Sequence, residues 1–584
     1  MMEWSDLTPR IELSRPRPLR VALPVLLCGD LVDSPEHLGP AYIAAVLRAA
    51  GAEVAIIEAE LDRDDDALAE IIALRPDIVG IGLTTVAVEP ARRFGARLRA
   101  ALGPAPLIVG GGAVATHLGA TLLTNSGWQF LDAVVRGEGE IPMLRLAETV
   151  HGGGDLGAVP SLCWRRADGT IAETAIQRGA SDLDRLPFPA RDQLARHGGR
   201  LPYVRLSTSR GCTGRCAFCN APHSRNGVGP AAKPWRGASP RRIVDEIAAL
   251  VGRFGCNTFD FIDSTFEDPG GGEIGKARVR AIAEEIIARN LRIYFNVFMQ
   301  AQNWSAADQP LLELLWRAGL EKVCVGIESG NDADLERWHK RSRLADNTRI
   351  IALLRRLGVH VAFGFIAFHP WSSFDTVRAN HAFLRDHVGH NLRRFTVRLE
   401  LYPGAEVVET LASAGMLSPD FHQTLNPYAY RYRDERIQRL ASCLSAIFDE
   451  EYSHNSTLRE VPAVFRFETY DIVLHNFISR IARAYPGDGV AGDILAGFRT
   501  ELAAIKHEMA RHNFALVCEL TDRAETGRLE VADARRWAAP TQRLFLDRIE
   551  QIERLKMRYG LRLRRHGIDV AAIAAASQPA RISA

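Results

Sequence analysis

The stretch SRGCTGRCAFCN, residues 209–220, contains the most informative motif of this chain. It places Cys212, Cys216 and Cys219 on one compact loop with the spacing C-x3-C-x2-C, directly after the strand-like run VRLSTS. Three thiolates on such a loop can ligate three irons of a cubane iron–sulfur cluster and leave the fourth iron without a protein ligand. The amino and carboxylate groups of a methionine derivative can fill that open position. The loop therefore predicts an iron–sulfur site just beyond the end of a strand.

The same loop also allows a zinc site. His223 follows Cys219 after three residues and would complete a Cys3His ligand set. Structural zinc loops seldom open a long α/β repeat, so the surrounding sequence favours the cluster over zinc. Three unrelated buried cysteines at this spacing are a further, weaker alternative.

Six strand-like runs follow one another between residues 201 and 410, with helical segments between most of them. They are VRLSTS (204–209), TFDFID (258–263), IYFNVFM (293–299), KVCVGIES (322–329), VAFGFIAF (361–368) and RFTVRLEL (394–401). Six such units predict a partial (β/α)6 barrel, in which reactive groups lie at the C-terminal ends of the strands.

The regions on either side of this barrel have different patterns. Residues 18–150 alternate strands and helices, which predicts a Rossmann-like parallel sheet with helices on both faces. Residues 151–200 predict a hairpin around Asp168-Gly169, followed by a proline-rich linker. Residues 411–584 lose the strand pattern and predict helices that cap the barrel and select the substrate. The expected architecture is thus α/β with a helical C-terminal region.

Composition excludes several classes of protein. The chain has 584 residues and a formal net charge of only +2, and no dense basic block suggests nucleic acid. The N-terminus is too polar for a signal peptide, and no apolar run reaches the ~20 residues of a membrane helix. Nine cysteines, most of them scattered singly, argue against a disulfide framework. We therefore expect a cytoplasmic protein with no membrane span.

The cysteine spacing, the preceding strand and Phe218 between the last two cysteines resemble the radical SAM superfamily. The resemblance implies that Cys212, Cys216 and Cys219 bind a [4Fe–4S] cluster that holds S-adenosylmethionine. FIDSTFED (261–268) and VGIESGN (325–331) are similar to the family's second-strand and fourth-strand motifs, and LELYPGAE (399–406) matches its closing turn. By this resemblance the residues that contact S-adenosylmethionine are Phe218, Asp263, Glu328 and Ser329.

The fifth strand departs from the family pattern. It is followed by FIAFHPWSS (365–373) where the family often has a Pro-Gly-Glu-Thr-like turn. This segment makes His369 and Trp371 candidates for the substrate side of the site. Aromatic residues packed in the barrel mouth are the simpler alternative.

The N-terminal region resembles the cobalamin-binding domain that precedes the barrel in the cobalamin-dependent radical SAM family, which includes class B methyltransferases. Glycine turns after strands let backbone amides approach a large planar ligand closely. A nucleotide-binding Rossmann domain is the alternative, but no G-x-G-x-x-G follows the first strand. No Asp-x-His-x-x-Gly motif occurs, so the resemblance implies cobalt without a histidine from that motif. The expected cobalamin contacts are Gly39, Thr84, Thr85, Gly110, Gly111, Gly112, Gly137, Glu138, Gly139 and Glu140.

Taken together, the resemblances imply a C-methyltransferase. It would move methyl from methylcobalamin to an unactivated carbon of a small, natural-product-type substrate, with a reducing partner such as flavodoxin or ferredoxin. A cobalamin-dependent radical SAM enzyme that catalyses a rearrangement or cyclisation without methylation is the alternative within the class. A cobalamin- or zinc-binding sensor without catalysis is the alternative outside it.

Overall fold

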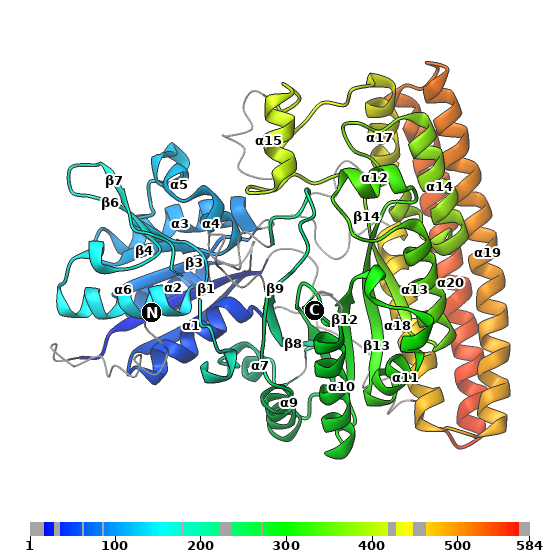
Figure 1. The fold of residues 1–584 in the computed structure, drawn as a ribbon, viewed down its shortest axis with the longest axis horizontal. Coiled ribbons are helices and arrows are strands. Elements are labelled where there is room, and N and C mark those ends of the chain that lie inside the picture. Colours follow the sequence, from blue (N-terminus) through cyan, green and yellow to red (C-terminus); the bar gives the residue numbers. More distant parts are fainter. Residues whose placement is uncertain are drawn as a thin grey trace.

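The computed structural model describes residues 17–27, 36–60, 64–84, 87–177, 179–199, 201–221, 235–269, 272–418, 428–447 and 463–570. Two α/β units and a set of long helices follow one another along the chain (Figure 1). This order confirms the fold class expected from the sequence.

The first unit is built on a seven-stranded sheet in the order β2-β1-β3-β4-β5-β6-β7. Its first five strands are parallel. The strand β1, RVALPVLL, lies between β2 and β3 and is buried along almost its whole length, as expected for a parallel strand covered on both faces. The strands are β1 (Arg20–Leu27), β2 (Glu53–Glu60), β3 (Ile78–Gly82), β4 (Leu107–Gly111), β5 (Ala133–Val135), β6 (Leu162–Arg165) and β7 (Ile171–Glu173).

Helices cover both faces of this sheet, each with its own apolar core. One core is formed with α1 (Leu38–Ala49) and α6 (Glu140–Gly152). The other includes residues of α2 (Asp64–Leu74), α3 (Val88–Leu102), α4 (Ala113–Leu118) and α5 (Ala120–Thr124). The predicted hairpin is present as β6 and β7, which pair antiparallel and extend the sheet to Glu173, past residue 150.

The second unit is an open, five-stranded parallel sheet in the order β14-β13-β12-β11-β8. Its strands are β8 (Val204–Leu206), β11 (Thr258–Phe261), β12 (Tyr294–Met299), β13 (Leu320–Glu328) and β14 (His360–Phe365). A short antiparallel pair, β9 (Ser209–Gly211) and β10 (Trp235–Gly237), flanks the cysteine loop. The helices of this unit are α7 (Asp192–Arg196), α9 (Pro240–Phe254), α10 (Glu273–Ala288), α11 (Gln309–Ala318), α12 (Asp332–Arg337), α13 (Leu344–Arg356) and α14 (Phe374–Val388).

The sixth predicted strand, residues 394–401, is not a strand. Residues Leu392–Phe395 form a 3-10 turn, and only one parallel bridge, between Phe368 and Arg398, joins the segment to the chain that follows β14. The Leu399 N–H donates to the Phe368 carbonyl at 2.8 Å, so the segment still lies in the sixth place. Because this isolated bridge lies past the end of β14, no described strand pairs with β14 on the side away from β13, and this side is the open edge of β14.

The C-terminal helices pack mainly along the side of the barrel (Figure 1). They are α15 (Glu406–Ser413), α17 (Glu435–Ala446), α18 (Ala463–Ala484), α19 (Gly489–Glu525) and α20 (Arg535–Arg565). A buried ion pair ties α18 to β13, with Arg480 Nη2 2.7 Å from Glu321 Oε2. The helix α15 lies beside the cysteine loop, since the Val407 N–H donates to the Ala217 carbonyl at 2.9 Å. Among the helices described here, none has the length and apolar character that crossing a membrane requires.

Candidate active site between the two α/β units

The cysteine loop leaves β9 at Gly211 and carries its three thiols within eight residues. Backbone amides support two of the sulfurs: the Gly214 N–H donates to Cys212 Sγ at 3.2 Å and the Ala221 N–H to Cys219 Sγ at 3.4 Å. All three cysteines are free and partly exposed. N–H···S bonds to cluster thiolates are a recognised way of tuning iron–sulfur sites. The donor set therefore fits a cluster with three protein ligands, while His223 lies outside the described residues.

Two carboxylates in the segment that follows β11 accept hydrogen bonds from the cysteine loop and from the residues just before it. Asp268 accepts hydrogen bonds from the Thr213 N–H at 2.9 Å and the Thr213 hydroxyl at 2.7 Å. Asp263 accepts from the N–H groups of Thr208 and Ser209, both at 2.8 Å, and from the Thr208 hydroxyl. Asp263 is 1% exposed. Its contacts place it in the support of the loop, and its predicted contact with S-adenosylmethionine stays a prediction.

Glu328 ends β13 in a backbone conformation with φ of +64°, which few non-glycine residues adopt. Its carboxylate lies over Gly326 and Gly364, where a Cβ would come within 2.9 Å and 3.2 Å of its oxygens. The buried Lys340 Nζ is 3.6 Å from Glu328 Oε1. Burial opposes the charge of Lys340, but Glu328 and the thiols of Cys216 and Cys212 raise its pKa. The site thus presents a carboxylate and an ammonium side by side next to the cysteine loop.

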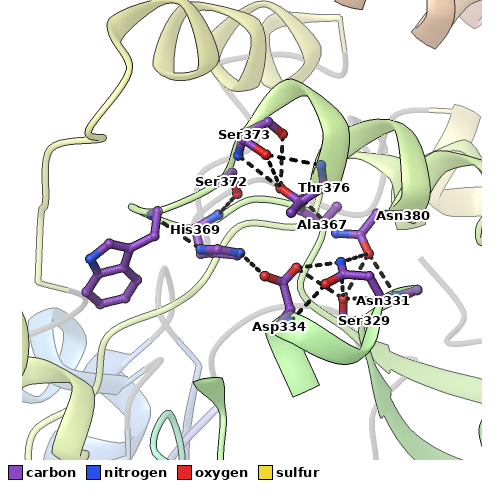
Figure 2. A network of polar contacts seen from close by, with 11 residues as sticks. Ser329, Asn331, Asp334, Ala367, His369, Ser372, Ser373, Thr376 and Asn380 are labelled. Carbon is purple, nitrogen blue, oxygen red and sulfur yellow. Dashed lines mark hydrogen bonds and ion pairs between the residues drawn. The ribbon is translucent and has the colours of Figure 1, made fainter. Parts of the chain in front are cut away.

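Ser329 points into a buried polar network (Figure 2). Its hydroxyl lies 2.9 Å from Asn380 Oδ1 and 3.1 Å from Asp334 Oδ2, which share its one proton. On the far side of this network, His369 Nε2 is 3.0 Å from Asp334 Oδ1. Because His369 Nδ1 accepts from the Trp371 N–H at 3.3 Å, we assign the ring proton to Nε2. Burial alone would raise the pKa of Asp334, but the bond from His369 lowers it.

This network fixes the mouth of the barrel around the cysteine loop. The ring of Trp338 packs edge-on against His369 at 5.0 Å and against Phe218 at 5.9 Å. The Ala217 N–H donates to the Trp338 carbonyl at 3.0 Å. His369 is 1% exposed, so in this structure it supports the site from within, whereas Trp371 is partly exposed. Whether Phe218 and Ser329 touch S-adenosylmethionine stays a prediction.

A cavity of about 430 Å³ lies between the first sheet and the barrel. The first unit contributes the predicted cobalamin residues Gly39, Thr84, Gly110, Gly111, Gly112, Gly137, Glu138, Gly139 and Glu140. Thr85 lies outside the described residues. The barrel contributes Arg205, Ser207, Arg210 and Ile262. The cavity therefore opens to both units at the C-terminal ends of their strands.

Glycines shape the floor of this cavity. A Cβ at Gly39, Gly82 or Gly111 would meet no atom within 4 Å, so these three positions border open space. Gly112 has φ of +95°, and a Cβ there would lie 3.1 Å from the Leu83 carbonyl oxygen. The residues present thus fit a large planar ligand that approaches the backbone closely.

The acidic side chains of the predicted cobalamin turn face the barrel. Glu138 Oε2 is 2.7 Å from Arg210 Nη1, and Glu140 Oε1 is 2.5 Å from Arg210 Nη2. Arg236 of β10 also pairs with Glu138. Burial alone would raise the pKa of Glu140, but the Arg210 guanidinium lowers it. Arg210 stands two residues before Cys212, so these ion pairs connect the cavity directly to the cysteine loop.

Several residues at the site had no signal in the sequence. Lys340 and Arg210 are brought to the site by contacts between distant segments. Gln300 follows β12 and donates from Nε2 to Cys212 Sγ at 3.4 Å. His37 lines the cavity at the start of α1, and burial lowers its pKa to about 4. For Gln300 and His37, the sequence indicated only that they lie at a strand end and at a helix start, respectively.

Replacing Arg210 by methionine should destabilise the junction between the two units. Glu140 would lose its guanidinium partner while its side chain stays 8% exposed, and breaking a buried pair costs about 3–5 kcal/mol. We expect a loss of that size in the free energy of unfolding, measured by urea titration. The double variant Arg210→Met/Glu140→Gln should lose less than the sum of the two single variants. Strict additivity would show that the pair contributes no coupling.

Comparison with known proteins agrees with this division of the chain. The family described as B12 binding domain matches residues 26–147, and the radical SAM superfamily matches residues 206–379. An anaerobic magnesium-protoporphyrin IX monomethyl ester cyclase of Rubrivivax gelatinosus is 28% identical over 59% of this chain and 61% of its own length. An uncharacterized methyltransferase of Pyrococcus horikoshii is 27% identical over 65% of this chain and 79% of its own length. The chain thus spans about three fifths of the cyclase.

A solved structure shares the whole architecture. The cobalamin-dependent S-adenosylmethionine radical enzyme OxsB, with aqua-cobalamin and S-adenosylmethionine bound, superposes with a TM-score of 0.62. The superposition covers 91% of this chain and 84% of that chain at 18% identity. At this identity the likeness shows the fold alone.

Proposed function

This chain combines a B12-binding domain with a radical SAM domain, as cobalamin-dependent radical SAM enzymes do, and from that premise we propose that it is a C-methyltransferase. Its cofactors are a [4Fe–4S] cluster, S-adenosylmethionine and cobalamin. The methyl group passes by way of cobalamin to an unactivated carbon of a small molecule. The electron for the cluster comes, in this proposal, from a one-electron donor such as flavodoxin or ferredoxin.

One observation carries the proposal: both units line a single cavity. Gly39 and Gly111 border it from the first sheet, and Ser207 and Arg210 border it from the strand and hairpin that lead into the cysteine loop. A ligand seated on the glycines of the first sheet therefore faces the segment that carries Cys212. Transfer of a group between two bound cofactors and a substrate needs this proximity.

The side chains at the site have separable tasks in this proposal. Cys212, Cys216 and Cys219 hold the cluster, and the Gly214 and Ala221 amides support two of its sulfurs. When bound, the cluster supplies the electron that cleaves S-adenosylmethionine, and cobalamin supplies a carrier for methyl groups.

Glu328 can accept a hydrogen bond from the amino group of the methionine part of S-adenosylmethionine, and the Lys340 ammonium can pair with its carboxylate. Since Gly326 and Gly364 lack side chains, the Glu328 carboxylate can lie flat over them. We propose that this pair orients the methionine part of S-adenosylmethionine. The segment around α15, which touches the cysteine loop, would shield the site from water and contact the substrate.

A substrate-free experiment tests methyl transfer directly. The reconstituted, cobalamin-loaded chain is reduced and given S-adenosylmethionine with a deuterated methyl group. We expect the label in the cobalamin fraction and an equimolar amount of S-adenosylhomocysteine, both measured by liquid chromatography with mass spectrometry. With the substrate present, each turnover should yield one methylated product, one 5′-deoxyadenosine and one S-adenosylhomocysteine.

The named cyclase relative favours a second candidate, a non-methylating rearrangement or cyclisation. The same experiment separates the two functions. Formation of 5′-deoxyadenosine with no labelled cobalamin and no S-adenosylhomocysteine would favour cyclisation. S-adenosylhomocysteine without 5′-deoxyadenosine in the presence of substrate would instead indicate a polar methylation.

A further inference from the structure

A second cavity, of about 580 Å³, lies at the opposite end of the barrel from the cysteine loop. Its lining residues come from the open edge of β14 and from the helices α13, α14, α18 and α19. Lys322 of β13 and His360 of β14 are partners in register and line its inner end. Glu328 is six residues further along β13, so about 20 Å of strand separates this cavity from the site proposed for S-adenosylmethionine.

The walls of this cavity carry more positive than negative charge. Four permanent cations line it, against two carboxylates, and these residues are Lys322, Arg355, Arg394, Lys506, Glu468 and Asp471. Glu468 pairs with Arg394, and Asp471 pairs with Lys506. Within the described ranges, Lys322 and Arg355 form no ion pair. The cavity thus has a surplus of two positive charges that its own carboxylates leave unbalanced.

Three partly buried imidazoles add hydrogen-bonding groups to the same walls. Burial lowers the pKa of His360 well below its usual value and that of His475 to about 4, so both rings are neutral at pH 7. The two rings meet edge-on at 5.1 Å. The Nε2 atom of His475 is buried and has no hydrogen-bond partner among the described residues. His390 is held by Asp471 at 3.1 Å.

We propose that this cavity is a binding site for the phosphate group of a small phosphorylated metabolite. A phosphate monoester carries close to two negative charges at neutral pH, which matches the surplus on Lys322 and Arg355. Lysine and arginine are the side chains that proteins use most for phosphate oxygens. The volume is in the range of small-molecule sites and leaves room for the organic part of the ligand. A divalent cation would instead face a net positive wall.

Inorganic phosphate is the probe that tests this site. Isothermal titration of the full-length chain should give saturable binding that equal ionic strength of chloride does not reproduce. Lys322→Met should weaken binding about tenfold or more, because it removes one of the two unbalanced cations. Lys322 has no ion pair among the described residues, so this change leaves no carboxylate unpaired and the fold should persist.

Arg241→Met is the matched control, since this arginine is 85% exposed on α9 and far from the cavity lining. It should bind phosphate like the unmodified chain. Arg355→Met, at the rim, should weaken binding in parallel with Lys322→Met and serves as a second variant if the first does not fold. No saturable binding, or equal binding by the Lys322, Arg355 and Arg241 variants, would overturn the proposal. A variant in which Cys212, Cys216 and Cys219 are all replaced by alanine should still bind phosphate, so this test can fail or succeed independently of the proposed function.

Discussion

Replacing Cys212, Cys216 and Cys219 together by alanine should reduce the [4Fe–4S] signal of the reconstituted chain to background. These three thiols are partly exposed and lie together on one loop, and backbone amides donate hydrogen bonds to two of their sulfurs. Without them, the cysteines of the described residues offer no other compact set that could ligate three irons. The measurement is electron paramagnetic resonance of the reduced protein, together with iron and labile sulfide content.

Cys256→Ala and Cys324→Ala are the matched controls for this prediction. Neither thiol belongs to the cysteine loop: Cys256 is buried in the segment between α9 and β11, and Cys324 lies within β13. Both variants should keep the full cluster signal. A cluster that survives the triple replacement, or that is lost in either control, would show that other residues bind it.

Replacing Gly111 by leucine should abolish cobalamin binding while the chain still folds. A side chain at Gly111 meets no atom within 4 Å and projects into the cavity between the two units. Leucine would occupy the space that the corrin needs, so we expect affinity to fall by about 100-fold or more, equivalent to about 2.7 kcal/mol. Absorbance of protein-bound cobalamin after gel filtration measures the loss.

Gly252→Leu provides the control, because Gly252 is exposed on α9 and also has open space around its Cβ position. It should bind cobalamin like the unmodified chain. Normal cobalamin binding by the Gly111 variant would mean that cobalamin occupies a different surface.

The sequence allowed the cysteine loop and the sheet-end glycines to be predicted because these signals are local. The C-x3-C-x2-C spacing and Gly110-Gly111-Gly112 are both short runs that follow apolar strands. Their positions at strand ends were enough to place them at one edge of each sheet. The three domains and their order followed from the same alternation of strands and helices.

Side-chain partners from distant segments were beyond such reasoning. Glu138 and Glu140 were expected beside the corrin; both line the cavity, and their carboxylates pair with Arg210, about 70 residues later in the sequence. Ser329 was expected at S-adenosylmethionine, yet its hydroxyl is bound by Asn380 and Asp334 within the barrel. These pairings depend on how the two units and the strand ends pack in space, which periodicity does not encode.

The missing sixth strand has a different cause. Residues 394–401 alternate apolar and polar side chains as a strand would. In the structure, Arg394 forms an ion pair with Glu468 of α18 and donates a hydrogen bond to the Phe363 carbonyl. The segment begins in a 3-10 turn at these residues. Tertiary contacts have overridden the local pattern. Because this segment forms no strand beside β14, the open edge of β14 borders the second cavity.

The most direct test of the proposed cofactors is to measure the cofactor content of one anaerobically reconstituted sample. Iron, labile sulfide, zinc and cobalamin are measured on the same full-length chain after gel filtration. We expect iron and sulfide in the proportions of one [4Fe–4S] cluster per chain, an equimolar amount of cobalamin and no stoichiometric zinc. A chain that holds zinc and lacks iron and sulfide would contradict the assignment of a radical enzyme.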